Sequence, residues 1–174
     1  MKWRGWLAAL GIVCLTFQGC GYTTRSALPE NVKSIYVKTV VNKINVAEII
    51  SYKPGLEIDI TNAIVRRLQR DGNLKVAKIP EEADVILESD LIRFDQEGLR
   101  FSRLETSQEQ RIYIVLALRL IDAKTKQIMW EEANFSGDQE YFTSELRDQA
   151  HDEAADLAVD RLARNVVDRI VEDW

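Results

Sequence analysis

The stretch RIYIVLALRLID, residues 111–122, carries the clearest pattern in the chain. Its aliphatic side chains recur at every second position, as Ile112, Ile114, Leu116, Leu118 and Leu120. The intervening positions hold Arg111, Tyr113, Val115, Ala117 and Arg119. Such alternation is typical of an antiparallel strand with one buried face and one wet face. The stretch therefore predicts a sheet that is covered on a single side.

Further strands are predicted on both sides of this stretch. A polar turn at 122–126 leads to a hairpin partner over 127–135, which residues 136–138 are predicted to interrupt. Upstream, residues 85–94 form a strand with Glu88 and Asp90 on its wet side, and residues 96–98 mark a bend. Two more strands are predicted, over 32–41 and 74–79.

Two segments have the period of an amphipathic helix. Leu56, Ile60, Ile64 and Leu68 recur every four residues, and Gly72 follows as a helix stop. The last element, from an N-cap at Ser144 to the end, is predicted as one long helix. Its apolar stripe comprises Leu146, Ala150, Ala154, Leu157, Ala158, Leu162, Val166 and Ile170. Residues 42–53 have no clean period and are predicted as a loop.

These elements together predict the fold class. It is an α+β two-layer sandwich, with two helices packed on one face of a mostly antiparallel sheet of four to five strands. The other face of the sheet is left open.

The N-terminal segment is predicted to be an export signal. Lys2 and Arg4 precede an apolar run over residues 6–17, which is too short to cross a bilayer as a helix. The run ends at Phe17-Gln18-Gly19-Cys20, which resembles a bacterial lipobox, although Phe17 replaces the usual aliphatic residue. Residues 1–19 are therefore expected to be a signal peptide, 20–31 a tether lipidated at Cys20, and 32–174 one domain. The alternative is an unmodified Cys20 beside an ordinary signal cleavage site.

Charge and composition exclude several functional classes. The formal charge is −5, and loss of residues 1–19, which contain Lys2 and Arg4 but no acid, changes it to −7. An acidic chain disfavours general nucleic-acid binding. One histidine and two cysteines are too few for the usual zinc site or a disulfide scaffold. No cofactor is expected apart from the covalent acyl groups on Cys20.

An enzymatic role is not expected. His151 has no serine, cysteine or lysine placed beside it by a catalytic motif, and we interpret it as a surface residue of the final helix. The carboxylates are spread along helix faces, where solvation explains them. Trp130 and Trp174 are interpreted as packing residues.

Several short motifs, in a fixed order, resemble one family. They are CGY at 20–22, LPENVKSIYV at 28–37, PGLE at 54–57, DGNLKV at 71–76, AD at 83–84, MWE at 129–131 and FSG at 135–137. This series resembles the lipopolysaccharide-assembly lipoprotein family, LptE, over nearly the whole mature chain. The chain departs from the family's usual asparagine–threonine region at Asn42-Lys43-Ile44-Asn45.

The resemblance implies a location and a role. The protein would be an outer-membrane lipoprotein on the periplasmic side of a Gram-negative envelope. It would plug the LptD β-barrel, assist the assembly of that barrel and take part in lipopolysaccharide transport. Gly21 after Cys20 resembles the signal for transfer to the outer membrane.

Binding of lipopolysaccharide needs cations for its phosphates. Between Lys78 and Lys124 every basic residue is an arginine, and these are Arg93, Arg100, Arg103, Arg111 and Arg119. The planar guanidinium fork suits phosphate, so these five are the candidate lipopolysaccharide contacts. Arg100 and Arg103 are placed at a bend between two strands. The alternative is a set of solvated arginines offset by nearby carboxylates, which are Asp95, Glu97, Glu105 and Glu109.

A second function remains open, that of a free periplasmic lipid carrier or an envelope-scaffold lipoprotein without a barrel. A barrel plug predicts that a partner covers the open sheet face and the loops at 95–110 and 136–143. A carrier predicts an apolar cavity inside the domain.

Overall fold

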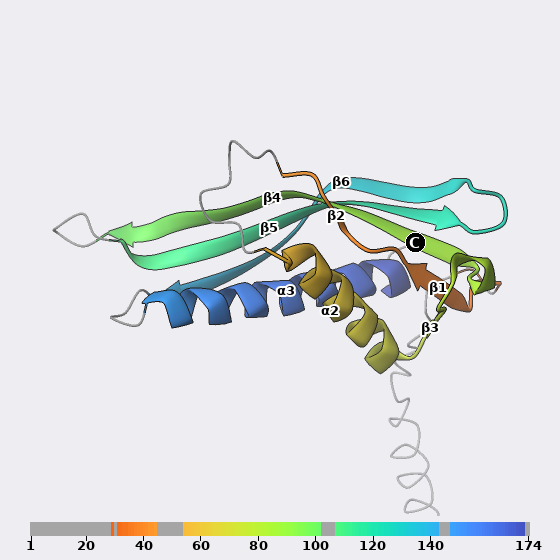
Figure 1. Ribbon diagram of the computed structural model, residues 1–174, viewed down its shortest axis with the longest axis horizontal. Helices are drawn as coiled ribbons and strands as arrows, with labels where there is room; N and C mark the ends of the chain where they lie inside the picture. Colours follow the sequence, from red (N-terminus) through yellow and green to blue (C-terminus); the bar gives the residue numbers. More distant parts are fainter. Residues whose placement is uncertain (1–28, 30, 45–53, 102–106, 143–146, 173–174) are drawn as a thin grey trace, which may run out of the picture.

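The computed structural model describes residues 29, 31–44, 54–101, 107–142 and 147–172, and it has two layers (Figure 1). One layer is a sheet of six strands: β1 (Ser34–Val37), β2 (Val41–Asn42), β3 (Lys75–Val76), β4 (Val85–Phe101), β5 (Ser107–Asp122) and β6 (Ile128–Phe142). The other layer is a pair of helices, α2 (Leu56–Asp71) and α3 (Arg147–Glu172), which lie on one face of the sheet. The predicted α+β class is therefore confirmed.

The sheet is mixed, with the predicted antiparallel pairing along its long strands and parallel pairing of its short ones. Its order is β3-β1-β4-β5-β6, and β2 also pairs with β4. The pairs β4–β5 and β5–β6 are antiparallel, whereas β1, β2 and β3 pair in parallel. There are six strands, more than the predicted four to five, because the predicted strand over 32–41 is divided into β1 and β2.

The division between β1 and β2 has a local cause. The Lys38 amide still donates to the Leu87 carbonyl of β4 at 3.0 Å. The Val40 amide donates instead to Thr61 Oγ1 of α2 at 3.0 Å, and the Val40 side chain is buried. The chain thus leaves the sheet to contact α2 and rejoins it at Val41, where β2 begins.

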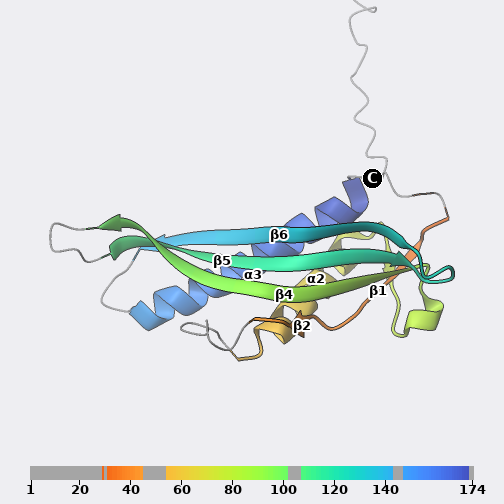
Figure 2. The ribbon, with the colours of Figure 1, turned by 90° about the horizontal axis from the view of Figure 1, so that it is seen from above.

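The three long strands form a ribbon in which β4, β5 and β6 lie side by side (Figure 2). At a rise of ~3.3 Å per residue each strand is about 50 Å long. β4 continues through the predicted bend at 96–98, where the register shifts between Gly98 and Arg100. The predicted interruption at 136–138 is wrong, because β6 pairs with β5 through all three residues. The predicted loops at 95–110 and 136–143 are consequently mostly strand.

The two helices follow their predicted apolar stripes with one exception. In α2, Leu56, Ile60, Ile64 and Leu68 are buried, and Gly72 caps the helix in the left-handed conformation. In α3 the predicted stripe residues Ala154, Ala158, Leu162, Val166 and Ile170 are buried, whereas Leu157 is exposed. The predicted positions Ser144 and Leu146 and most of the predicted loop at 42–53 lie outside the described residues. No helix in the described segments is long and apolar enough to cross a membrane.

The core lies between the helices and the sheet. Ile112, Ile114, Leu116, Leu118 and Leu120 of β5 are all buried there, as their alternation predicts. Burial of each such side chain contributes about 1.5–3 kcal/mol to the free energy of folding. Neither α2 nor α3 covers the opposite face of the ribbon, so in the described part of the chain the predicted open face is present (Figure 1).

Candidate functional site

The open face of the ribbon carries three of the five arginines predicted as lipopolysaccharide contacts. Arg93 of β4 and Arg111 and Arg119 of β5 project on the side opposite the buried aliphatic row, because alternate residues of a strand face opposite ways. Arg100 belongs to the end of β4, where it pairs with Glu109 of β5. Arg103 lies outside the described residues.

Arg119 is held by carboxylates of the neighbouring strand. Its guanidinium lies 3.2 Å from Glu88 and 3.8 Å from Asp90, both on β4. Glu88 also contacts Lys38 at 3.0 Å. The wet side predicted for Glu88 and Asp90 is therefore a row of ion pairs.

Arg111, near the start of β5, forms a second cluster of ion pairs on the open face. It bonds Glu140 of β6, and its Nε lies 3.4 Å from Asp138. The Glu140 carboxylate, which accepts this hydrogen bond, holds the pKa of Arg111 above its usual range. Glu97 of β4 stands opposite Arg111 and adds a further negative charge.

Arg93 lies between these two groups. Its guanidinium is 3.6 Å from Asp95 and stacks over the Tyr113 ring, with 5.4 Å between the guanidinium carbon and the ring centroid. The Tyr113 hydroxyl in turn donates to Ser136 Oγ at 3.1 Å. A chain of polar contacts therefore crosses β4, β5 and β6.

The open face as a whole is acidic. The three arginines share it with Glu88, Asp90, Asp95, Glu97, Glu131, Asp138 and Glu140. A phosphate that approached Arg93, Arg111 or Arg119 would have to displace carboxylates already in place. Such a face, charged and internally paired, suits contact with a polar protein surface. The role of the five arginines in binding lipopolysaccharide stays a prediction.

A shallow hollow interrupts the middle of the open face. Two alanines, Ala117 and Ala133, line it together with Asp90, Arg119 and Glu131, and its volume is about 620 Å³ including space open to solvent. The short alanine side chains create this depression between longer charged ones, so it could receive a side chain of a partner.

The covered face ends in a polar cluster that the sequence did not predict. Tyr141 donates its hydroxyl proton to Gln110 Oε1 at 2.6 Å, and Gln96 Nε2 donates to the Tyr141 oxygen at 2.5 Å. His151 of α3 packs edge-on against Tyr141 and Phe94, with ring centroids 6.2 and 6.5 Å apart. His151 is thus a packing residue with only 23% of its side chain exposed, rather than a freely solvated one.

Trp130 also packs, as predicted. Its ring is partly buried against the core, and the Arg169 guanidinium lies 4.8 Å from its centroid. Arg169 is itself 3.3 Å from Glu132. Trp174 lies outside the described residues.

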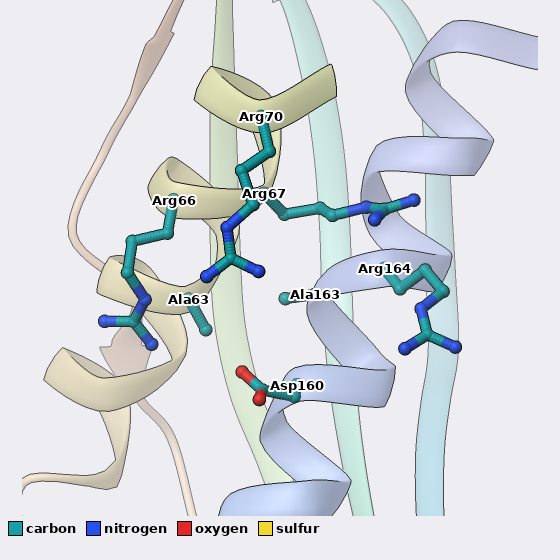
Figure 3. A pocket seen from close by; sticks show the side chains of 7 residues that line it. All are labelled: Ala63, Arg66, Arg67, Arg70, Asp160, Ala163 and Arg164. Carbon is teal, nitrogen blue, oxygen red and sulfur yellow. The ribbon is translucent and has the colours of Figure 1, made fainter.

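A second group of arginines surrounds a hollow at the contact of α2 and α3, and of these the Arg70 guanidinium lies between the two helices (Figure 3). Arg66, Arg67 and Arg70 of α2 and Arg164 of α3 line a hollow of about 350 Å³, which includes space open to solvent. The predicted phosphate contacts are confined to the arginines between Lys78 and Lys124, so these residues are not among them. The spacing of 66, 67 and 70 on one helix was an available signal, but the approach of Arg164 depends on how the helices dock.

The two-layer fold occurs in other bacterial proteins. A protein from Xanthomonas campestris is 14% identical, with 82% of this chain and 86% of that chain covered and a TM-score of 0.59. A hypothetical protein from Chlamydia trachomatis is 14% identical, with coverage of 80% and 95% and a TM-score of 0.56. A minor lipoprotein from Acinetobacter baumannii is 11% identical, with coverage of 80% and 92% and a TM-score of 0.52. At these identities the likeness concerns the fold, a small α+β domain.

The family follows from the sequence itself. A family model described as LptE, lipopolysaccharide-assembly, matches residues 32–174. The chain belongs to this family, as the order of its motifs predicts. No curated protein sequence matches the chain.

Proposed function

We propose that this chain is an outer-membrane lipoprotein that plugs the LptD β-barrel, assists its assembly and takes part in lipopolysaccharide transport. Acyl chains on Cys20 would anchor it to the periplasmic side of the membrane, since stable anchoring needs more than one chain. Its role is structural and non-enzymatic. Membership of the family supports a part in lipopolysaccharide assembly. The partnership with the LptD barrel is the subject of the experiment below.

The open face of the ribbon carries the proposal. Three long strands present a face that α2 and α3 leave uncovered, and paired charges on this face surround a few apolar residues such as Val115 and Ala117. The lumen of a large outer-membrane barrel is polar. A face of this chemistry can contact a polar lumen without burying unpaired charge, which would be costly.

The length of the ribbon also supports the proposal. Strands of about 50 Å exceed the apolar band of an outer-membrane barrel, which is ~25 Å tall. A plug of this length can contact the barrel wall through the whole height of the membrane.

The test is affinity purification of the tagged, lipidated protein from detergent-solubilised outer membrane, followed by mass spectrometry. We expect a large β-barrel protein in stoichiometric amount that survives high salt. High salt screens exposed charges, so survival indicates a shape-matched contact.

A pair of variants locates the contact. Ala117→Lys places a long cation in the hollow of the open face, opposite Asp90, and should abolish recovery of the barrel. Asn62→Lys makes the same gain of charge on the exposed side of α2 and should leave recovery unchanged. Circular dichroism checks that both variants fold.

The alternative outcome is recovery of a lone lipoprotein. It would overturn the barrel partnership and favour the free carrier or envelope scaffold. A lipid bound to the purified protein would then separate a carrier from a scaffold.

A further inference from the structure

The outer edge of β6 has no partner strand in the described part of the chain. β6 ends the strand order β3-β1-β4-β5-β6, and it is the outermost strand of the ribbon on its side (Figure 2). α3 packs on the covered face of β6, where Leu162 of the helix meets Gly137. A free edge presents a row of main-chain N–H and C=O groups, and these groups can pair with another strand.

The direction of the main-chain groups in β6 follows from β5. The Asp122 amide donates to the Gln127 carbonyl at 2.9 Å, so the main-chain groups of Asp122 point toward β6. These groups alternate in direction along a strand, and the extra residues at the register shifts belong to β6, so the alternation along β5 is unbroken. Ile112 is an even number of positions from Asp122 and also points toward β6. Its partner Gln139 therefore points back toward β5.

The residues that alternate with Gln139 direct their main-chain groups to the free edge. Asp138 and Glu140 flank Gln139, and Ser136 has the same direction two positions earlier. The Glu140 carbonyl agrees with this direction, because it accepts a hydrogen bond at 2.7 Å from the Gln139 side chain. The edge thus offers donors and acceptors at every second residue.

The side chains beside this edge are acidic. Arg111 is surrounded by Asp138, Glu140 and Glu97, so the carboxylates outnumber the cation. β6 contains no lysine, arginine or proline. Lysine and proline are common protections of a free edge strand, and β6 has only its carboxylates. Carboxylates repel an acidic strand but attract a basic one.

We infer that the outer edge of β6 over residues 136–142 binds an extended, positively charged strand of another protein, which adds to the sheet beside β6. The main chain of that strand would pair with Ser136, Asp138 and Glu140. Its side chains on the open face would stand next to the two carboxylates, where lysine or arginine is favoured. The exposed Phe142 ring at the end of the segment suits an apolar side chain.

A second copy of this chain does not fit the edge. An antiparallel pair of two such edges, centred on residue 139, would place Asp138 of each copy opposite Glu140 of the other. Like charges directly opposite each other destabilise a strand pair. The wall of a closed barrel does not supply the strand either, because its strands pair with one another. The inference therefore goes beyond the proposed function and concerns a different partner segment.

The test measures binding of a fluorescein-labelled peptide to the full-length protein in non-ionic detergent by fluorescence anisotropy. The probe, Thr-Val-Thr-Lys-Thr-Lys-Thr-Val-Thr, is rich in β-branched residues and carries its lysines on one face of a strand. We expect it to bind, and we expect the same peptide with glutamates in place of the lysines to bind at least ~10-fold more weakly. Equal binding of the two peptides, or no binding of the first, would overturn the inference.

Hydrogen exchange of single amides distinguishes strand addition from attraction between charges alone. In the free protein the Gln139 amide, which faces β5, should exchange more slowly than the amides of Asp138 and Glu140. The bound peptide should slow exchange at Asp138 and Glu140 at least ~10-fold, because both amides then gain an acceptor. Gln139 should change little. Binding without this protection would also overturn the inference.

Two substitutions of one residue test the main-chain contact. Ser136→Pro removes an N–H that faces the free edge, a position at which a sheet tolerates proline. Ser136→Ala is the matched control, because it also removes the hydroxyl but keeps the N–H. We expect the proline variant to weaken peptide binding ~5-fold and the alanine variant less than ~2-fold. Equal affinities in the two variants would contradict the inference.

A charge variant serves if circular dichroism shows that the proline variant does not fold. Glu140→Gln removes one carboxylate beside the edge and should weaken binding of the lysine peptide ~3-fold. Glu153→Gln, the same change on the exposed side of α3, should leave it unchanged. None of these measurements involves the barrel, so failure of peptide binding and failure to recover the barrel are separate results.

Discussion

Gly137 of β6 lies directly against Leu162 of α3. A Cβ atom at Gly137 would stand 2.7 Å from Leu162 Cβ and 2.8 Å from its Cα. Both atoms belong to a buried residue of the helix, so neither can rotate away. The absence of a side chain at residue 137 therefore sets how closely α3 packs on the sheet.

Gly137→Ala should destabilise the protein by about 2–3 kcal/mol, since α3 must move away from β6 and loosen the contacts around Leu162. Urea unfolding followed by circular dichroism measures this loss. Ser136→Ala is the control, because Ser136 is on the same strand but faces the open side, and it should cost less than about 1 kcal/mol. An alanine at 137 with wild-type stability would contradict the close packing.

The contact between Gly137 and Leu162 illustrates which features of the fold the sequence can predict and which it cannot. Alternation over residues 111–122 is a local property, and it correctly predicts β5 and its buried face. Gly137 was interpreted as a break, because glycine is a frequent strand breaker. Its actual role depends on Leu162, which is 25 positions further along the chain, and no local pattern contains that contact.

The ion pairs of the arginines also depend on contacts between residues far apart in sequence, which local patterns do not contain. The five candidate arginines were found from residue type, but their partners depend on strand register, as in the pairing of Arg119 with Glu88 across β4 and β5. The hollow at Arg67 and Arg164 needs the docking of two helices that are far apart in sequence. Residue type could therefore predict candidate arginines, whereas their carboxylate partners depend on the fold.

Asp84 ties the start of β1 to the start of β4. Its Oδ2 accepts hydrogen bonds from the amides of Lys33 and Ser34, each at 3.1 Å, and from Ser34 Oγ at 2.8 Å. The Lys33 amide, followed by the Ser34 hydroxyl, lowers the pKa of Asp84. A carboxyl whose pKa is lowered by folding stabilises the protein above its unfolded pKa of about 3.9, and this contribution is lost as the pH falls through the folded pKa.

Asp84→Asn should therefore lower the free energy of unfolding by about 1–3 kcal/mol at neutral pH. The difference from wild type should shrink as the pH falls below about 4, because the wild-type carboxylate becomes protonated there. Urea unfolding at a series of pH values measures both effects. Lys124→Ala removes only an exposed lysine 3.7 Å from Asp84 and should change stability by less than about 1 kcal/mol.

Thr61 holds the chain where it leaves the sheet between β1 and β2. Its hydroxyl accepts from the Val40 amide at 3.0 Å and donates to the Glu57 carbonyl at 2.7 Å. Thr61→Val has a similar shape but leaves the Val40 amide without its acceptor, so it should cost about 1–3 kcal/mol. Thr61→Ser keeps the hydroxyl and should retain most of the stability. Hydrogen exchange of the Val40 amide should accelerate in the valine variant alone.

The five arginines proposed to contact lipopolysaccharide differ in how strongly the protein neutralises them. Arg119 is held by Glu88 and Asp90, and a phosphate gains little from a cation that two carboxylates already occupy. We predict the main contribution from Arg100 and Arg103, which stand three positions apart in the sequence. The variant with Arg100→Glu and Arg103→Glu should weaken binding of labelled lipopolysaccharide at least ~10-fold, which corresponds to loss of a charge-assisted hydrogen bond.

Arg119→Gln is the control for this experiment, and its effect on the Kd should be less than about threefold, because the arginine it removes is already paired. Fluorescence anisotropy with the full-length protein in detergent measures both. Unchanged affinity in the double variant would exclude a phosphate contact at Arg100 and Arg103. An equal loss in the Arg119 variant would instead move the contact onto the open face, where lipopolysaccharide and a barrel would compete for the same surface.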